Sequence, residues 1–216
     1  MEREPTWKFT PKHHWSVKNH MLSGICFLAW VKMLWRLRED VDWFCYWHRL
    51  LFLTLMSLFN SLLALPDWIL YSSAIQKEHI NPRPVFILGH PRTGTTHLHN
   101  LLSLDTEQFI FSNTFQVGFP SSFLCNEALG SRLLAPILDD TRPMDNMALS
   151  FKIPQEDELA HNVLSSGCSP YMPLVFPASH KRFRPFFTFE DGCSKADFES
   201  WADSFTFFFK KVWTWL

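Results

Sequence analysis

The chain has 216 residues, of which 47% are hydrophobic and 16% aromatic, and its formal net charge at pH 7 is −1. This length and apolar content allow one domain with a sizeable core, or one domain plus an extension. The balanced charge gives no indication of nucleic-acid binding, so we expect no nucleic-acid partner. The five cysteines are widely spaced, odd in number and without a Cys-x-x-Cys pair, which argues against a disulfide framework and a zinc site and mildly indicates a reduced compartment.

The beginning of the chain predicts neither a clear signal peptide nor a full transmembrane span. Residues 1–20 are polar, and the apolar stretch that follows ends at Lys32. A second apolar run, residues 50–65, is also shorter than the roughly 18 residues that a spanning helix needs. Localisation is therefore left open between the cytoplasm and a membrane surface.

Two interpretations of the run 50–65 remain. Thr54, Ser57 and Ser61 recur at helical spacing. This spacing predicts a narrow, solvent-exposed polar stripe on a helix whose other faces pack against the main domain. The alternative is a helix that lies on or in a membrane. The residues that favour this alternative are tryptophans interspersed with basic residues, namely Trp30, Trp35, Trp43 and Trp47 with Lys32, Arg36, Arg38 and Arg49.

Residues 21–78 are predicted to be helical, with Pro66 starting or breaking one of the helices. The sequence "NPRP" at 81–84 stops helix formation, because proline restricts both itself and the residue before it. The short apolar run "VFIL" at 85–88 then suits a buried parallel strand. A tight loop over 89–94 and a helix over 95–104 complete a strand–loop–helix unit.

The rest of the chain contains weaker strand signals and stronger helix signals. "FIFS" at 109–112 predicts a second strand, and residues 113–153 are expected to form loops and short helix. The stretch 154–167 predicts a helix with proline near its start, acids in its first turn and glycine beyond its end. Residues 194–216 predict a further helix that starts with a capping box. Its apolar stripe comprises Phe198, Trp201, Phe205, Phe208, Val212 and Trp215.

The loop "GHPRTG" at 89–94 has the properties of an anion-binding loop. Gly89 and Gly94 allow a tight turn, and the backbone N–H groups of Thr93–Thr96 would point toward an anion at the helix N-terminus. A nucleotide-triphosphate loop has lysine after its second glycine, where this chain has Thr95. Arg92 supplies positive charge from within the loop instead. This substitution predicts a shorter anionic ligand and no metal.

The stretch "PVFILGHPRTGTTHLHNLL" resembles the 5′-phosphosulfate-binding loop of sulfotransferases that use 3′-phosphoadenosine 5′-phosphosulfate (PAPS). The stretches "SLFNSLLALPDWILY" and "RPMDNMALSFKIPQEDELA" are similar to one branch of that family. The resemblance implies an α/β fold with a P-loop-type parallel sheet flanked by helices. Its cofactor-binding residues would be Pro91, Arg92, Thr93, Gly94, Thr95 and Thr96.

The resemblance also implies a reaction, the transfer of a sulfuryl group from PAPS to a hydroxyl or amine. Arg92 would contact the bridging oxygen and the sulfuryl group, where charge develops. The acceptor class stays open among carbohydrates, lipids, small metabolites and protein tyrosine.

An acceptor that loses a proton needs a general base. The candidates are two histidines and three adjacent acids, namely His99, His161, Glu156, Asp157 and Glu158. Acids at the start of a helix are also common for purely structural reasons, because the helix dipole stabilises them.

The family pattern also implies later segments like "LKSPxH" and "RDP", which supply 3′-phosphate ligands and do not occur before Leu216. We therefore expect a helical, tryptophan-rich extension over 1–80 and the first part of a sulfotransferase domain over 81–216. The C-terminal half of the sheet would be missing and activity impaired. The alternatives are a non-catalytic anion-binding module and a membrane-surface interaction protein.

Overall fold

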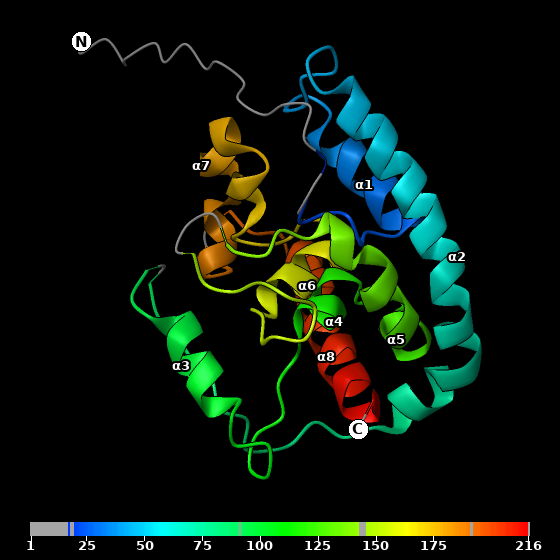
Figure 1. Cartoon of the computed structure of the whole chain (residues 1–216). Helices are drawn as coiled ribbons and strands as arrows, with labels where there is room; N and C mark the ends of the chain where they lie inside the picture. Colours follow the sequence, from blue (N-terminus) through cyan, green and yellow to red (C-terminus); the bar gives the residue numbers. More distant parts are fainter. Residues whose placement is uncertain (1–16, 18–19, 91, 143–145, 191, 216) are drawn as a thin grey trace.

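The computed structural model describes residues 17, 20–90, 92–142, 146–190 and 192–215. These residues form helices joined by loops and short 3-10 turns (Figure 1). The α-helices are α1 (Phe27–Leu37), α2 (Trp47–Lys77), α3 (Thr95–Leu102), α4 (Thr114–Gly118), α5 (Phe123–Leu134), α6 (Glu158–Leu164), α7 (His180–Phe183) and α8 (Lys195–Trp215). The 3-10 turns are η1 (Ala135–Ile137), η2 (Met172–Leu174), η3 (Pro177–Ser179) and η4 (Arg184–Phe187).

The predicted P-loop-type parallel sheet is wrong, because the described residues contain no strand and only isolated bridges such as Asn113 with Pro154. The expected strand 85–88 is exposed, with Leu88 89% accessible. A strand is stable only beside another strand that accepts its hydrogen bonds, and none of the described segments pairs with this one. The second expected strand, 109–112, is also absent.

Helix α2 confirms the predicted helix but reverses the predicted placement of its polar stripe. Thr54 Oγ1 accepts a hydrogen bond from the Trp30 indole at 3.0 Å, and Ser61 Oγ accepts one from the backbone N–H of Phe27 at 2.8 Å. Asn60 donates to the carbonyls of Ser23 and Ile25 at 2.6 and 3.1 Å. The polar stripe is therefore the buried contact with α1 and its N-terminal turn.

Pro66 neither starts nor ends a helix, because α2 continues through it to Lys77. Proline removes one helical hydrogen bond and bends a helix, and α2 curves inward in its lower part (Figure 1). The residue that follows shows what holds this part in place. Asp67 accepts hydrogen bonds from the backbone N–H groups of Leu124 and Cys125, at 3.0 and 2.9 Å, and so caps the first turn of α5.

A buried ion pair joins α2 to α8. Lys211 Nζ lies 2.8 Å from Asp67 Oδ2, and both side chains are almost inaccessible to solvent. The ammonium also donates to the backbone oxygen of Pro120 at 2.9 Å and lies 4.7 Å from the ring centroid of Phe123. Burial lowers the pKa of Lys211, and the carboxylate of Asp67 opposes that shift. The pair thus fixes α2, α5 and α8 to one another.

The two helices predicted from local signals in the second half are confirmed as α6 and α8. The predicted cap is present: the backbone N–H of Asp197 donates to Ser194 Oγ at 3.1 Å, and that hydroxyl donates back at 2.8 Å. The apolar stripe of α8 is only partly buried. Phe208 is inaccessible and Val212 nearly so, whereas Phe198 and Trp215 stay about half exposed.

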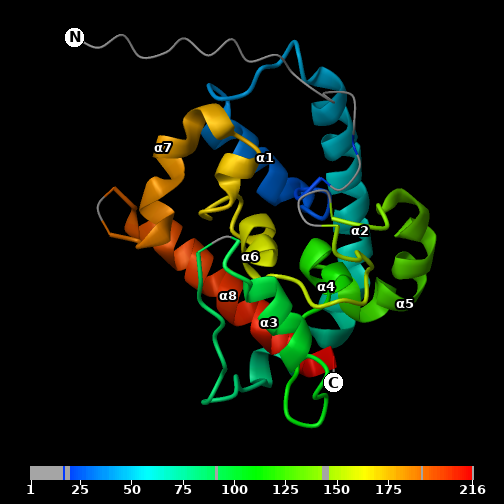
Figure 2. The same cartoon turned by 60° about the vertical axis from the view of Figure 1, so that its left-hand side comes forward.

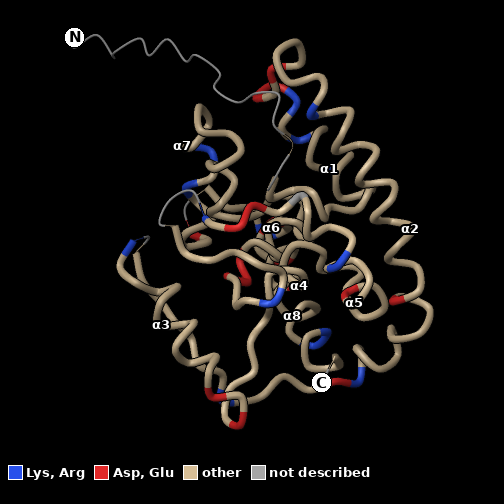
Figure 3. Tube along the Cα trace, viewed as in Figure 1, with Lys and Arg blue, Asp and Glu red and all other residues tan. Residues whose placement is uncertain are grey.

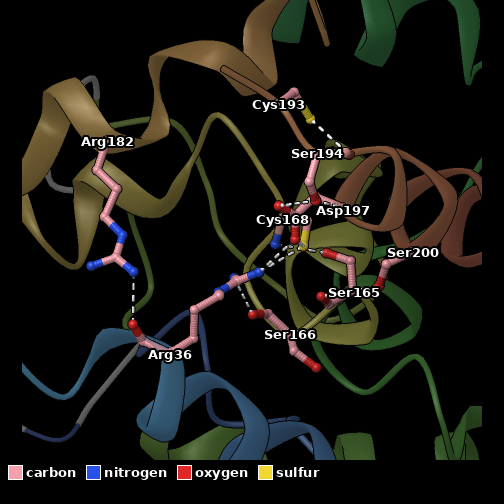
Figure 4. Close-up of polar contacts among 9 residues, drawn as sticks. All are labelled: Arg36, Ser165, Ser166, Cys168, Arg182, Cys193, Ser194, Asp197 and Ser200. Carbon is pink, nitrogen blue, oxygen red and sulfur yellow. Dashed lines mark hydrogen bonds and ion pairs between the residues drawn. The ribbon is translucent and has the colours of Figure 1, made fainter.

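A second polar cluster ties α1 to the start of α8 (Figure 4). The guanidinium of Arg36 donates to the backbone oxygen of Ser166 at 2.6 Å and lies 3.2 Å from Asp197 Oδ1. It also contacts Cys168 Sγ at 2.9 Å. Arg182 donates in turn to the backbone oxygen of Arg36 at 2.7 Å. The N-terminal helices are therefore anchored to the rest of the chain at two separate places.

Candidate functional site

The loop before α3 folds tightly on itself. The backbone N–H and the hydroxyl of Thr93 both donate to the carbonyl oxygen of His90, at 3.2 and 2.6 Å. Gly94 has φ 98°, a left-handed conformation that glycine adopts without strain. A Cβ on Gly89 would lie 2.6 Å from the Thr95 methyl carbon, so the turn also requires glycine there. Pro91 lies outside the described residues.

The loop presents donors at the N-terminus of α3. The first α-helical hydrogen bond runs from the N–H of Leu98 to the carbonyl of Gly94 at 3.0 Å. The amides of Thr95–His97 precede it, and such amides together with the helix dipole favour a bound anion. Arg92 and Thr93 are exposed, and Arg92 has φ 73°. The described part of the loop is thus compatible with an anion that approaches from solvent.

The structure adds a second arginine to this region. Arg142 Nη1 donates to Thr96 Oγ1 at 3.2 Å, across a separation of 46 residues. A guanidinium suits phosphate and sulfate oxygens because its donors form a planar fork. The sequence contained Arg142 in the stretch "RPMDN", but no local pattern connects it to the loop. The contact depends on the tertiary structure that brings Arg142 to α3, which no short motif specifies.

His99 lies one helical turn after Thr95, on the same side of α3. It is partly buried, and its ring meets Phe111 edge to face with 6.4 Å between the ring centroids. Burial lowers the pKa of His99, while the carboxylates of Asp157 and Glu156 oppose that shift. The imidazole is therefore neutral at pH 7 and able to accept a proton. The structure brings together this histidine and the acids at the start of α6.

Glu156 and Glu158, both predicted as candidate bases, are held by hydrogen bonds. The hydroxyl of Tyr171 donates to Glu156 Oε2 at 2.6 Å. Ser169 Oγ donates to Glu158 Oε1 at 2.7 Å, and the Trp201 indole lies 3.3 Å from both oxygens of Glu158. Burial raises the pKa of Glu158, and the hydrogen bonds from Ser169 and Trp201 oppose the shift. These contacts suit a structural role, in which Glu158 anchors α8.

Asp157 and His161 form a pair one turn apart on α6. His161 Nε2 lies 3.1 Å from Asp157 Oδ2, and the imidazole is inaccessible to solvent. Burial raises the pKa of Asp157, but the hydrogen bond and electrostatic attraction of His161, together with a backbone hydrogen bond and the smaller effect of His99, outweigh burial and hold that pKa below its usual value. The imidazole is enclosed by aromatic rings of α8, namely Trp201, Phe205, Phe208 and Phe209. His161 therefore has no direct access to an acceptor from solvent.

Two further properties of the described residues bear on the site. They contain no group of three or more His, Cys, Asp or Glu side chains able to hold a metal ion. An open groove of about 660 Å³ runs beside α5 and is lined by residues 124–140, 149–152 and Trp215 in part. None of the predicted site residues lines this groove.

Comparison with known sequences bears on the class of protein. Residues 84–161 match the profile of the sulfotransferase family, a range that includes the loop, α3, Arg142 and the acids of α6. Residues 84–161 therefore belong to the sulfotransferase family, and the predicted family is confirmed over this range. No solved structure matches the chain.

Two curated relatives are similar in sequence to most of this chain. Both are named omega-hydroxy-beta-dihydromenaquinone-9 sulfotransferase Stf3, from Mycobacterium bovis (strain ATCC BAA-935 / AF2122/97) and Mycobacterium tuberculosis (strain CDC 1551 / Oshkosh). Each is 31% identical over 190 residues, which are 88% of this chain and 48% of the relative. The chain thus spans about half the length of the curated relatives it matches. Because the match covers 190 of the 216 residues, it includes α1, α2 and the loop wherever it starts.

Proposed function

We propose that this protein takes part in sulfuryl transfer from PAPS to a hydroxyl group. The observation that carries the proposal is the loop at the start of α3. It offers backbone amides and the charge of Arg92, while Thr95 stands where a nucleotide-triphosphate loop has lysine. Membership of the sulfotransferase family supports the same reaction class. We keep the division into a helical extension, 1–80, and a transferase part, 81–216, as part of the proposal.

The chemistry of the donor set fits a phosphosulfate. Gly94, Thr95 and Thr96 would hold the 5′-phosphate through amides and hydroxyls, and Arg142 would add charge beside Thr96. Pro91 and Thr93 would shape the loop. Arg92 would stabilise the charge that develops between donor and acceptor. PAPS supplies the activated sulfuryl group when it is bound, and the proposal includes no metal.

Among the candidate bases we favour His99. It lies one turn from Thr95, and burial lowers its pKa, so it is neutral at pH 7. Its role would be to accept the proton of the acceptor hydroxyl at a ring nitrogen. Glu156 and Glu158 accept hydrogen bonds from Tyr171, Ser169 and Trp201. We therefore assign them to positioning the start of α6 instead.

The acceptor we propose is a hydroxyl on an apolar, lipid-like molecule. The support is the name of the mycobacterial relatives, which states that they act on omega-hydroxy-beta-dihydromenaquinone-9. An apolar acceptor is compatible with an enzyme that works at a membrane surface. If sulfuryl transfer occurs to a carbohydrate or an amine instead, that acceptor replaces the lipid-like hydroxyl in the proposal.

A second candidate function is anion binding without turnover by these 216 residues. It is favoured by the lack of a sheet behind the loop in the described residues. Labelled-sulfate transfer from PAPS to lipid, carbohydrate and amine acceptors distinguishes the two functions. Turnover supports the enzyme, whereas binding alone supports the second candidate.

The loop itself is tested by calorimetry on three proteins. The unsubstituted chain should bind adenosine 3′,5′-bisphosphate more tightly than ATP with magnesium. Arg92→Ala should weaken binding of the bisphosphate by about tenfold or more, because a charge-assisted contact is lost. Arg184→Ala, an exposed arginine of η4, is the matched control and should bind normally. Tighter binding of ATP with magnesium would contradict the proposal.

A further inference from the structure

Although Leu53 and Ile75 are buried, helix α2 carries many of its apolar residues on the outside of the protein. Six of them recur at alternating spacings of four and three residues, and each is between 43% and 67% exposed. We call this stripe the apolar face, and it comprises Leu51, Leu55, Leu58, Leu62, Leu65 and Ile69. Since the polar stripe of the same helix is buried against α1, α2 has the opposite polarity from a helix at the surface of a water-soluble domain.

The apolar face is also free of charge along its length. Between Arg49 and Lys77 the sequence holds a single charged residue, Asp67. That carboxylate is buried and paired with Lys211, so it contributes nothing to the surface. Figure 3 shows α2 as an almost uncoloured tube with charges near its two ends. At 1.5 Å rise per residue this charge-free length is about 40 Å.

Aromatic residues extend the apolar face at the start of α2. Trp35, Trp43, Phe44 and Trp47 are 47–95% exposed around the connection from α1 to α2. Arg38 stacks on Trp35 with 4.9 Å between the guanidinium carbon and the ring centroid. Tryptophan beside arginine is typical of the boundary between acyl chains and headgroups. Trp68, 69% exposed, lies in the second half of the same helix.

We propose that the apolar face binds the surface of a lipid bilayer, with α2 lying in the plane of the membrane. A spanning orientation would separate α2 from its polar contacts with α1 and would break the buried Asp67–Lys211 pair. The alternating spacing also resembles a coiled-coil seam, but such seams are flanked by charged residues that set the pairing. Here the flanking positions between Arg49 and Lys77 carry no exposed charge, which favours lipid over a second copy of the chain.

The orientation is compatible with access to the phosphate loop. Helices α3 and α2 lie on opposite sides of the molecule in Figure 1, and in Figure 2 α3 lies toward the viewer, over α8, with α2 to its right. A membrane beneath α2 therefore leaves the loop open to water, from which a charged nucleotide would arrive. The inference concerns a different surface from the loop and stands whether or not sulfuryl transfer is demonstrated.

Flotation with lipid vesicles tests the inference on the full chain. The vesicles contain phosphatidylcholine alone or phosphatidylcholine with phosphatidylglycerol, and they are separated from unbound protein in a density gradient. The test variant is Leu55→Glu with Leu62→Glu, which places two charges on the apolar face. The matched control is Leu104→Glu with Leu174→Glu, at two sites that are 78% and 73% exposed outside α2. Circular dichroism and the melting temperature verify that each variant folds.

We expect the unsubstituted chain and the control variant to float with both kinds of vesicle. The bound fraction of the test variant should fall by about tenfold or more, because two apolar contacts with the bilayer are replaced by charge. Failure of the unsubstituted chain to float would overturn the inference. So would normal flotation of a folded test variant. A discrete dimer that does not float and that the test variant converts to monomer would assign the apolar face to a second copy.

Discussion

The hairpin of α1 and α2 and the loop before α3 satisfy their polar and apolar groups in different ways. In the hairpin, polar side chains of α2 pair with α1 inside the protein beside buried apolar residues such as Met33 and Leu53, and a second apolar stripe of α2 faces outward. Before α3, the apolar segment 85–88 is exposed and has no neighbouring strand among the described residues. The first region is held by long-range side-chain contacts, whereas the second is held by bonds within its own turn. We therefore expect stability to depend on the hairpin and ligand binding to depend on the loop.

The largest effect is expected from Lys211→Met. This change leaves the carboxylate of Asp67 buried without its partner, which typically lowers the free energy of unfolding by about 3–5 kcal/mol. Urea unfolding followed by circular dichroism measures the loss. Lys210→Met is the matched control, because Lys210 is more exposed and makes one hydrogen bond to the backbone of Gln76. A loss as small as that of the control would show that the pair does not hold α2 to α8.

Arg92→Ala should affect function while leaving the fold intact. In a form of the protein that turns over, sulfuryl transfer should fall by about 100- to 1000-fold, since a donor to the developing charge is lost. The free energy of unfolding should change by no more than about 0.5 kcal/mol, because the side chain is exposed. Initial rates with PAPS and a thermal melt measure both effects. A normal rate with an unchanged melt would exclude Arg92 from the mechanism.

Acid should destabilise the chain through His20, which precedes α1. Burial, with the charge of Arg49 as a smaller cause, lowers the pKa of His20 to about 4. The unfolded chain binds this proton below pH 6.5 and the folded chain only near pH 4. The free energy of unfolding should therefore fall as the pH drops through that window, by roughly 3 kcal/mol.

Urea unfolding at several pH values measures this slope. His20→Asn should flatten it, because asparagine has no proton to gain, while His180→Asn at an exposed site of α7 should leave it unchanged. An equal slope in both variants would assign the acid sensitivity to other groups.

The smallest effect is expected from Leu88→Asp. Leu88 is 89% exposed, so the change should alter the free energy of unfolding by no more than about 0.5 kcal/mol. Leu53→Asp, at a buried position of α2, is the contrasting change and should unfold the chain. If Leu88→Asp were strongly destabilising in a thermal melt, the segment 85–88 would be buried and the comparison between the two regions would fail.

Local signals predicted some of this structure correctly. The cap of Ser194 and Asp197 and the acids and glycine around 156–167 predicted α8 and α6, because each signal involves residues within one or two turns. The prediction of a strand at 85–88 was wrong, because a strand is stable only beside a neighbouring strand from elsewhere in the chain. The buried polar stripe of α2 was misplaced for a similar reason, since its partners are the backbone and Trp30 of a different element.

The candidate site was predictable to the same extent. Gly89, Arg92 and Gly94 lie within six residues of one another, so the loop could be recognised from the sequence alone. Arg142 could not be recognised, because it reaches Thr96 from 46 residues away. The choice among candidate bases also depended on the fold, because the partners of Glu156 and Glu158 lie in the later segments that contain Tyr171 and Trp201.

The buried pair of Asp67 and Lys211 sets an order of events during synthesis. A ribosome that adds about 5–20 residues per second needs roughly 7–29 s to make the chain between the two partners. During that interval the carboxylate of Asp67 has no ammonium to enter the core with, so α2 cannot complete its final packing. Its apolar face is already made and exposed throughout the same interval. A nascent chain of this kind would meet a chaperone or a membrane before α8 emerges.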